Sequence, residues 1–226
     1  MARARYEIRL MYRLPELLAV LAAWTLIGVA YANVMQDLPP GARARGVLAM
    51  LETALPLVAL FAVGHAASIE WEERTAELSL SYRGGSFGIL GHRLAIAGAL
   101  LVAVTILSVT AFAALMPEML KPGQVNAFRV GLTAVPPALL IGSASLLASI
   151  VGRGYLAGLA AGLALWGLDI LLPGKLTGPL YLFQASRPVS DLGLSLSANR
   201  IALCLLAALV LGAALVLWSR RERVVG

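Results

Sequence analysis

The stretch Ser-Ile-Glu-Trp-Glu-Glu-Arg-Thr-Ala-Glu-Leu at residues 68–78 is a charged island between two long apolar segments. Four of the twelve acidic residues of the chain lie in it: Glu70, Glu72, Glu73 and Glu77. The segments on either side, 47–67 and 89–115, are mainly apolar. Because charged side chains are costly inside a bilayer, an island between two membrane spans belongs in water on one side of it. We therefore predict that a soluble partner contacts the protein here.

The composition is that of a membrane protein with several spans. The 226 residues are 60% hydrophobic and only 13% charged, and the mean hydropathy is +0.85, whereas soluble domains carry about 25% charged residues. Backbone polar groups in lipid must be satisfied within each segment, which predicts helices. We predict an all-α membrane protein with six transmembrane helices in one domain, residues 1–226. The stretches long enough to span are 14–34, 47–67, 89–115, 127–150, 155–172 and 201–218.

The basic residues indicate the topology. They cluster at both ends of the chain, at Arg3, Arg5, Arg9, Arg13, Arg220, Arg221 and Arg223. Cytoplasmic flanks of membrane spans are rich in Lys and Arg, which predicts that both termini, and with them the island, are cytoplasmic. The net charge of +6 is otherwise scattered over helix ends without a basic stripe. Lipid headgroups are thus the expected contacts, and nucleic acid is not. The first apolar stretch is long enough to span and is expected to be uncleaved.

Two further segments are expected to lie at the membrane surface. Residues 1–13 alternate basic and apolar side chains, which predicts an amphipathic interfacial helix. Residues 173–199 are semi-apolar but too short and broken to span, which favours a re-entrant or interfacial hairpin on the external side. Its apolar residues are Leu180, Tyr181, Leu182, Phe183, Leu192, Leu194 and Leu196.

Three ionisable residues within the spans are candidates for a transport pathway or for polar contacts inside the membrane. They are Glu52, His65 and Asp169, and each is expected to lie near a span end with a polar partner. Gly154, Gly158 and Gly162 recur every four residues and predict close helix packing, within the chain or between two copies. Two histidines, one cysteine and scattered carboxylates give no metal-ligand cluster, so no metal or cofactor is predicted in this chain.

The charged island resembles a known motif. Residues 69–78, the glycine turn at 84–85 and Arg93 at the start of the third span are similar to the membrane subunit of ABC-2-type exporters. Arg74 stands where that family usually has glycine. The resemblance implies a cytoplasmic coupling region at 68–88 that touches an ATPase, and short re-entrant helices between spans five and six. The residues implied in ATPase coupling are Glu70, Glu72, Glu73, Arg74, Thr75, Glu77 and Leu78.

The resemblance also implies partners. The sequence contains no phosphate-binding loop, so ATP and Mg²⁺ are expected on a separate cytoplasmic ABC ATPase subunit, and the chain by itself is not expected to be an enzyme. Six spans form half of a transport path, which implies a second copy or a related permease subunit. The expected activity is alternating access for an amphipathic or lipid-like substrate in the plasma (inner) membrane of a prokaryote.

Two other functions remain open from the residues. One is an intramembrane hydrolase with Ser143 or Ser145 as the nucleophile, for which His65 and His92 are the available bases. The other is a membrane anchor that recruits a soluble complex through the island without transport.

Overall fold

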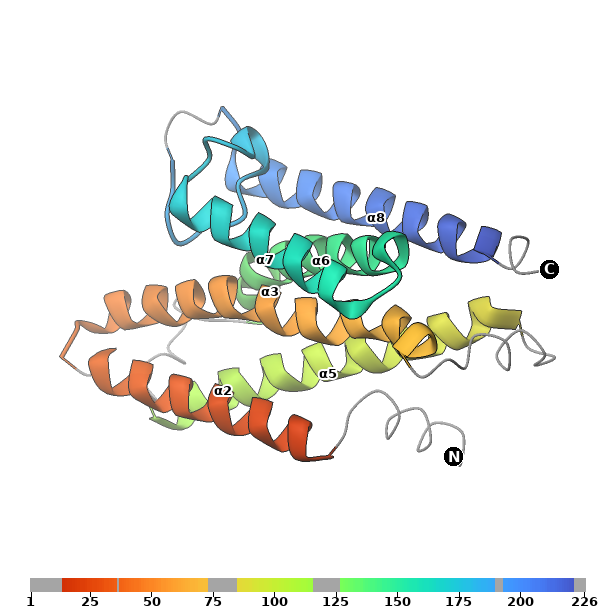
Figure 1. The fold of residues 1–226 in the computed structure, drawn as a ribbon. Helices are drawn as coiled ribbons and strands as arrows, with labels where there is room; N and C mark the ends of the chain where they lie inside the picture. Colours follow the sequence, from red (N-terminus) through yellow and green to blue (C-terminus); the bar gives the residue numbers. More distant parts are fainter. Residues whose placement is uncertain (1–13, 36, 73–84, 116–126, 190–192, 222–226) are drawn as a thin grey trace.

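The described residues of the computed structural model, 14–35, 37–72, 85–115, 127–189 and 193–221, form a helical bundle (Figure 1). They contain six α-helices and one 3-10 turn, and no strand occurs among them. The elements are α2 (Leu14–Met35), α3 (Pro40–Glu72), α5 (Gly85–Leu115), α6 (Ala127–Gly152), α7 (Tyr155–Leu171), η2 (Gly178–Leu180) and α8 (Leu196–Arg221). The predicted all-helical class is therefore confirmed.

Four of the helices are long and apolar enough to cross a membrane. Their apolar parts are Gly41–Ile69, Gly88–Leu115, Arg129–Gly152 and Leu196–Arg220. Among the residues whose side chains are described, the apolar stretches of α2 and α7 are shorter than these four. They are Trp24–Met35 and Tyr155–Leu171. A helix forms at each of the six predicted stretches, and a helical membrane protein is supported. Membrane crossing by α2 and α7 stays a prediction.

Helix α3 is longer than the apolar pattern indicates. It begins at Pro40 rather than near residue 47, and it continues to Glu72. Proline is favoured in the first turn of a helix, because the backbone N–H it lacks has no partner there. At the other end, Ser68 and Ile69 are buried parts of α3. The first residues of the charged island thus extend a span, and residues 85–88 already belong to α5. Residues 73–84 and the predicted interfacial helix at 1–13 lie outside the described residues.

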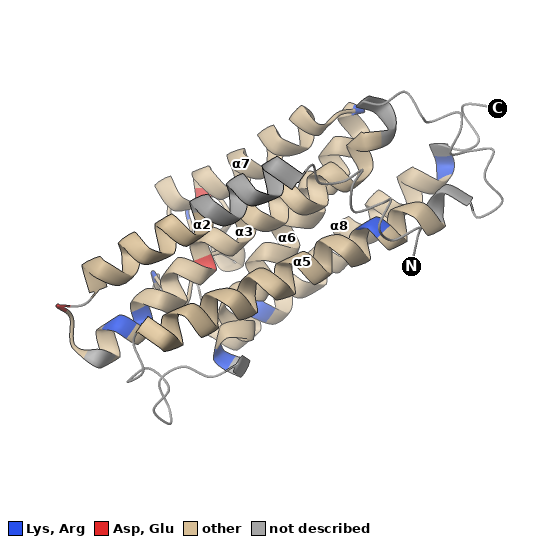
Figure 2. Cartoon of the chain, turned by 90° about the horizontal axis from the view of Figure 1, so that it is seen from below, with Lys and Arg blue, Asp and Glu red and all other residues tan. Residues whose placement is uncertain are grey.

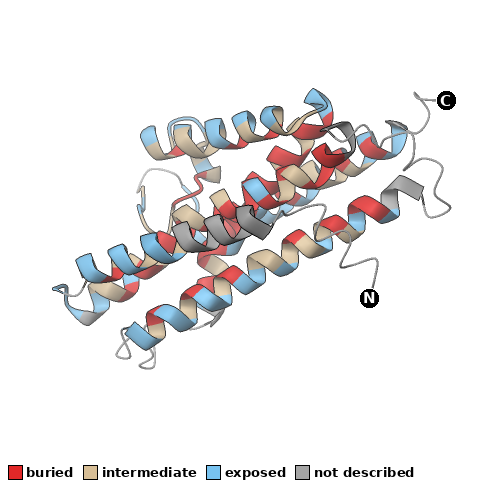
Figure 3. Ribbon diagram, turned by 60° about the horizontal axis from the view of Figure 1, so that its bottom comes forward, coloured by how far each residue is buried: buried red, intermediate tan, exposed pale blue. Residues whose placement is uncertain are grey.

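The helices run alternately up and down the bundle. In Figure 1 the α2–α3 and α7–α8 connections lie at one end, and α2 begins and α8 ends at the other. Helix α6 packs against α3, α7 and α8, so it is the central helix. Charged residues are sparse along the helices (Figure 2), and buried positions lie on the faces that turn toward other helices (Figure 3).

The helix packing depends on small residues. A Cβ atom at Gly158 of α7 would lie 1.9 Å from Oγ of Ser149 and 2.5 Å from the backbone oxygen of Ser145, both on α6. At Gly162 it would lie 2.4 Å from Cδ1 of Leu60 on α3. Gly154 precedes α7 with an extended backbone and donates its N–H to the Ser149 carbonyl. Gly158 and Gly162 therefore bring α7 close to α6 and α3 within one chain, whereas a Cβ at Gly154 would meet only the Gly152 backbone oxygen at 4.0 Å.

Candidate functional site

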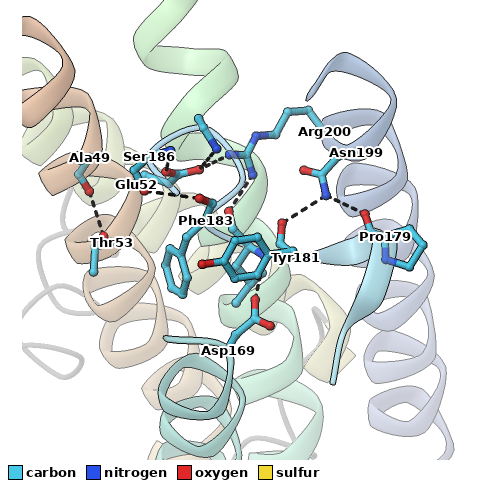
Figure 4. A network of polar contacts seen from close by, with 12 residues as sticks. Ala49, Glu52, Thr53, Asp169, Pro179, Tyr181, Phe183, Ser186, Asn199 and Arg200 are labelled. Atoms are coloured by element: carbon cyan, nitrogen blue, oxygen red, sulfur yellow. Dashed lines mark hydrogen bonds and ion pairs between the residues drawn. The ribbon is translucent and has the colours of Figure 1, made fainter. Parts of the chain in front are cut away.

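A buried carboxylate joins three parts of the chain. Glu52 of α3 is 0% exposed, and its carboxylate accepts hydrogen bonds from the backbone N–H groups of Ala185 (3.1 Å) and Ser186 (2.7 Å). It also forms an ion pair with Arg200 at the start of α8. Because a buried charge is costly unless it is paired and hydrogen-bonded, these contacts account for a carboxylate at this position. Figure 4 shows the arrangement.

The start of α8 supplies two side-chain donors to the network, Asn199 and Arg200. Arg200 is 1% exposed, and its Nη1 donates to the backbone oxygen of Leu182 at 2.8 Å. The neighbouring Asn199 donates from Nδ2 to the backbone oxygens of Pro179 (2.7 Å) and Tyr181 (3.1 Å). Two adjacent side chains thus bind three carbonyls of the connection between α7 and α8.

Asp169 binds the same connection from α7. Its carboxylate accepts hydrogen bonds from the Thr177 hydroxyl and from the backbone N–H of Leu182, the latter at 2.7 Å. We call residues 172–195 the α7–α8 segment. Irregular backbone inside a membrane bundle is tolerated where protein groups satisfy its N–H and C=O groups. Glu52, Asp169, Asn199 and Arg200 do this for backbone groups between Pro179 and Ser186.

The α7–α8 segment also contributes to the apolar core. Tyr181, Leu182 and Phe183 are buried and pack with Leu60 of α3 and residues of α6 and α8. The family resemblance implies short re-entrant helices here. Among the described residues of the segment, the structure has one short helical turn, η2. Burial, with a smaller effect of the nearby Asp169 carboxylate, raises the pKa of Tyr181. The phenol therefore stays neutral under ordinary conditions.

The network contains polar atoms beyond those that are paired. Tyr181 Oη, Gln184 Oε1, Asn199 Oδ1 and Arg200 Nε are buried, and none of them has a hydrogen-bond partner within the described part of the chain. Most buried polar groups in folded proteins are paired. This end of the bundle therefore has unused hydrogen-bonding capacity.

The predicted site residues separate into three groups. Glu52 and Asp169 bind the same segment, and each has polar partners. His65 lies elsewhere on α3, with its Nδ1 3.3 Å from the Ser68 hydroxyl and its ring edge-to-face with Tyr155. Glu70 and Glu72 are in the last turn of α3. The remaining coupling candidates Glu73, Arg74, Thr75, Glu77 and Leu78 lie outside the described residues.

The two serines considered as nucleophiles are engaged elsewhere. Ser143 donates to the backbone oxygen of Leu140 at 3.0 Å, and Ser145 donates to that of Leu60 at 3.3 Å. A serine nucleophile needs a base within hydrogen-bond reach of its hydroxyl. Each of these hydroxyls donates instead to a carbonyl of a helix.

Sequence reasoning missed the two arginines that join helices. The sequence pattern assigns Arg93 only to the motif at the third span, and it gives Arg200 no partner in another helix. The signal that distinguishes Arg200 is its position beside Asn199 at the start of an apolar helix. Neither residue reveals its acceptor in the sequence, because Glu52 is 148 positions away from Arg200.

Comparisons with known proteins give no relatives for this chain: no protein-family model matches it, and neither a curated protein nor a solved structure does. The described residues contain no group of three or more metal-ligating side chains.

Proposed function

We propose that this chain is the membrane (permease) subunit of an ATP-driven exporter of the ABC-2 type. The proposal is supported by the motif at 69–78 and by the helical, apolar architecture around it. One observation carries it furthest. Helix α3 is a single helix of 33 residues that links the acidic island to the buried network at Glu52. A helix of this kind suits a subunit that converts movement at one end into rearrangement at the other.

The proposal specifies partners and direction. A cytoplasmic ABC ATPase subunit binds ATP and Mg²⁺ and contacts the island, and a second copy or a related permease completes the path. The substrate class is amphipathic or lipid-like, and transport proceeds by alternating access between the two halves. Both termini are cytoplasmic, in the inner membrane of a prokaryote.

The test is purification from native membranes in mild detergent, followed by mass spectrometry of the proteins that accompany the chain. The expected result is a stoichiometric protein with a phosphate-binding loop, lost from the double variant E73K/E77K. The matched control is Asp37→Lys, a charge reversal at an exposed residue between α2 and α3. It should keep the partner, because that connection lies at the opposite end of the bundle (Figure 1).

Other results would change the assignment. If no nucleotide-binding protein accompanied the chain under several gentle conditions, the exporter proposal would be wrong. A soluble partner without ATPase activity would instead support the membrane anchor. Labelling of Ser143 or Ser145 by a serine-reactive probe would support the hydrolase, although both hydroxyls donate to backbone carbonyls.

A further inference from the structure

A proline lies one helical turn beyond the buried carboxylate. Pro56 is inside α3, four residues after Glu52. In an α-helix the N–H of each residue bonds to the carbonyl four positions earlier, so Pro56 has no N–H to give to the Glu52 carbonyl. The next carbonyl, that of Thr53, accepts a 2.8 Å hydrogen bond from Nε1 of Trp166 on α7. The backbone of α3 is therefore weakened in this turn and supported from a neighbouring helix.

The same turn carries a polar contact that depends strongly on geometry. The Glu52 carboxylate must be within reach of two backbone N–H groups on the α7–α8 segment and of Arg200 on α8 at once. A buried ion pair often stabilises a fold no more than apolar residues of the same size. In some proteins such a pair instead favours one arrangement of the helices that it joins over other arrangements. The unpaired Tyr181 Oη, Asn199 Oδ1 and Arg200 Nε show that this arrangement leaves some polar groups unused.

We propose that the Glu52–Pro56 turn is a conformational joint: Glu52 clamps residues 182–186 onto α8, and bending of α3 at Pro56 releases them and opens this end of the bundle. The clamp is made when α3 and α8 are close enough for the carboxylate to bind Arg200 and the segment together. Movement of α3 at this turn breaks all of these contacts together. The proposal goes beyond the exporter function and does not depend on an ATPase or a cargo.

Hydrogen exchange of the full chain in lipid nanodiscs, without any partner, tests the clamp. The readout is the exchange rate in peptides covering 180–189, which contain the amides bound by Glu52. In E52Q these amides should exchange roughly tenfold faster or more, because hydrogen bonds to a charged acceptor are lost. Peptides of α6 should exchange as in the unaltered protein. An unchanged rate at 180–189, or an equal rise throughout α6, would overturn the proposal.

A charge swap separates the clamp from a simple ion pair. In E52R/R200E the pair can form again, but a guanidinium, which only donates, then faces the N–H groups of Ala185 and Ser186. Exchange at 180–189 should therefore stay fast. Restoration of slow exchange by the swap would show that the pair alone matters, and the clamp would be rejected.

Replacement of the proline tests the joint. Pro56→Ala gives α3 the missing N–H and should stiffen the turn, so exchange at 180–189 should slow severalfold. The matched control is Pro137→Ala, which removes a buried proline inside α6 and should leave this peptide unchanged. Equal effects of the two substitutions, or no effect of Pro56→Ala, would contradict bending at this position.

Discussion

Arg93 of α5 donates a hydrogen bond from Nη1 to the backbone oxygen of Ala66 on α3, at 3.3 Å. Arg93 is buried, and so are Ala66, Ala67, Ser68 and Ile69 in the stretch of α3 that it contacts. Ala66, Ala67 and Ile69 pack with Leu90, Leu146 and Trp218 in one apolar cluster. The end of α3 that leads to the charged island is therefore held by α5, α6 and α8.

Replacement of Arg93 should destabilise that end of the bundle. Arg93→Met removes a charged donor and leaves the Ala66 carbonyl without it, which costs about 1.5–3 kcal/mol. The thermal midpoint in detergent, followed by tryptophan fluorescence, should fall by several degrees. Arg45→Met, at an exposed position near the start of α3, is the control and should leave the midpoint unchanged. Equal midpoints for the two variants would show that the Arg93 bond does not hold the helices.

Replacement of glycine by alanine should have opposite effects on stability at two positions of α7, Gly158 and Gly167. Gly158→Ala places a Cβ against α6, with the Ser145 backbone oxygen only 2.5 Å away, and such overpacking costs about 1–3 kcal/mol. A Cβ at Gly167 meets nothing within 4 Å, so Gly167→Ala should stabilise by up to about 1 kcal/mol through helix propensity. The midpoint of thermal unfolding should be highest for Gly167→Ala, intermediate for the unaltered protein and lowest for Gly158→Ala. The reverse order would contradict the described packing of α7 on α6.

Asp169 should control protease access to the α7–α8 segment. Asp169→Asn removes the charge that accepts from Thr177 and from the N–H of Leu182, at a cost of about 1–3 kcal/mol. Trypsin should then cleave faster after the exposed Lys175. Thr177→Val removes one of the two donors and should give an intermediate rate. If Asp169→Asn resisted trypsin as well as the unaltered protein, Asp169 would not hold the segment.

The environment of Cys204 tests which surface faces lipid. Cys204 is exposed on α8, inside the apolar stretch Leu196–Arg220. A nitroxide attached there should be relaxed more by oxygen, which dissolves in lipid, than by a water-soluble nickel chelate. The opposite preference is expected for Lys175→Cys in a Cys204→Ala background. Nickel relaxing the label at Cys204 more than oxygen would place this face of α8 in water.

The helices were predictable because continuous apolar runs determine them, and each predicted stretch contains a helix. The start of α3 could not be predicted from the apolar pattern, because Arg43 and Arg45 interrupt that pattern and yet belong to the helix. The burial of Tyr181, Leu182 and Phe183 agrees with a segment that is not a solvated loop. The semi-apolar composition of residues 173–199 was enough to predict that this segment is not a solvated loop.

The polar partners could not be predicted from one sequence. Glu52 was recognised as a costly residue that needs a partner, yet the partner follows from how α3 and α8 pack. Two of its contacts are backbone N–H groups, which every residue except proline has, so side-chain identity carries no signal for them. The exporter assignment depends on the resemblance at 69–78, and it stays a prediction.

The separation of Glu52 and Arg200 along the chain has a consequence for biogenesis. At about 5–20 residues per second, Glu52 is synthesised roughly 7–30 seconds before the arginine that pairs with it. During that interval α3 enters the membrane with a carboxylate whose charge no arginine of α8 yet balances. A chain interrupted before α8 keeps this uncompensated acid and lacks the donors that bind the α7–α8 segment. Unfinished copies are therefore chemically distinct from complete ones, because they carry a buried acid without its basic partner.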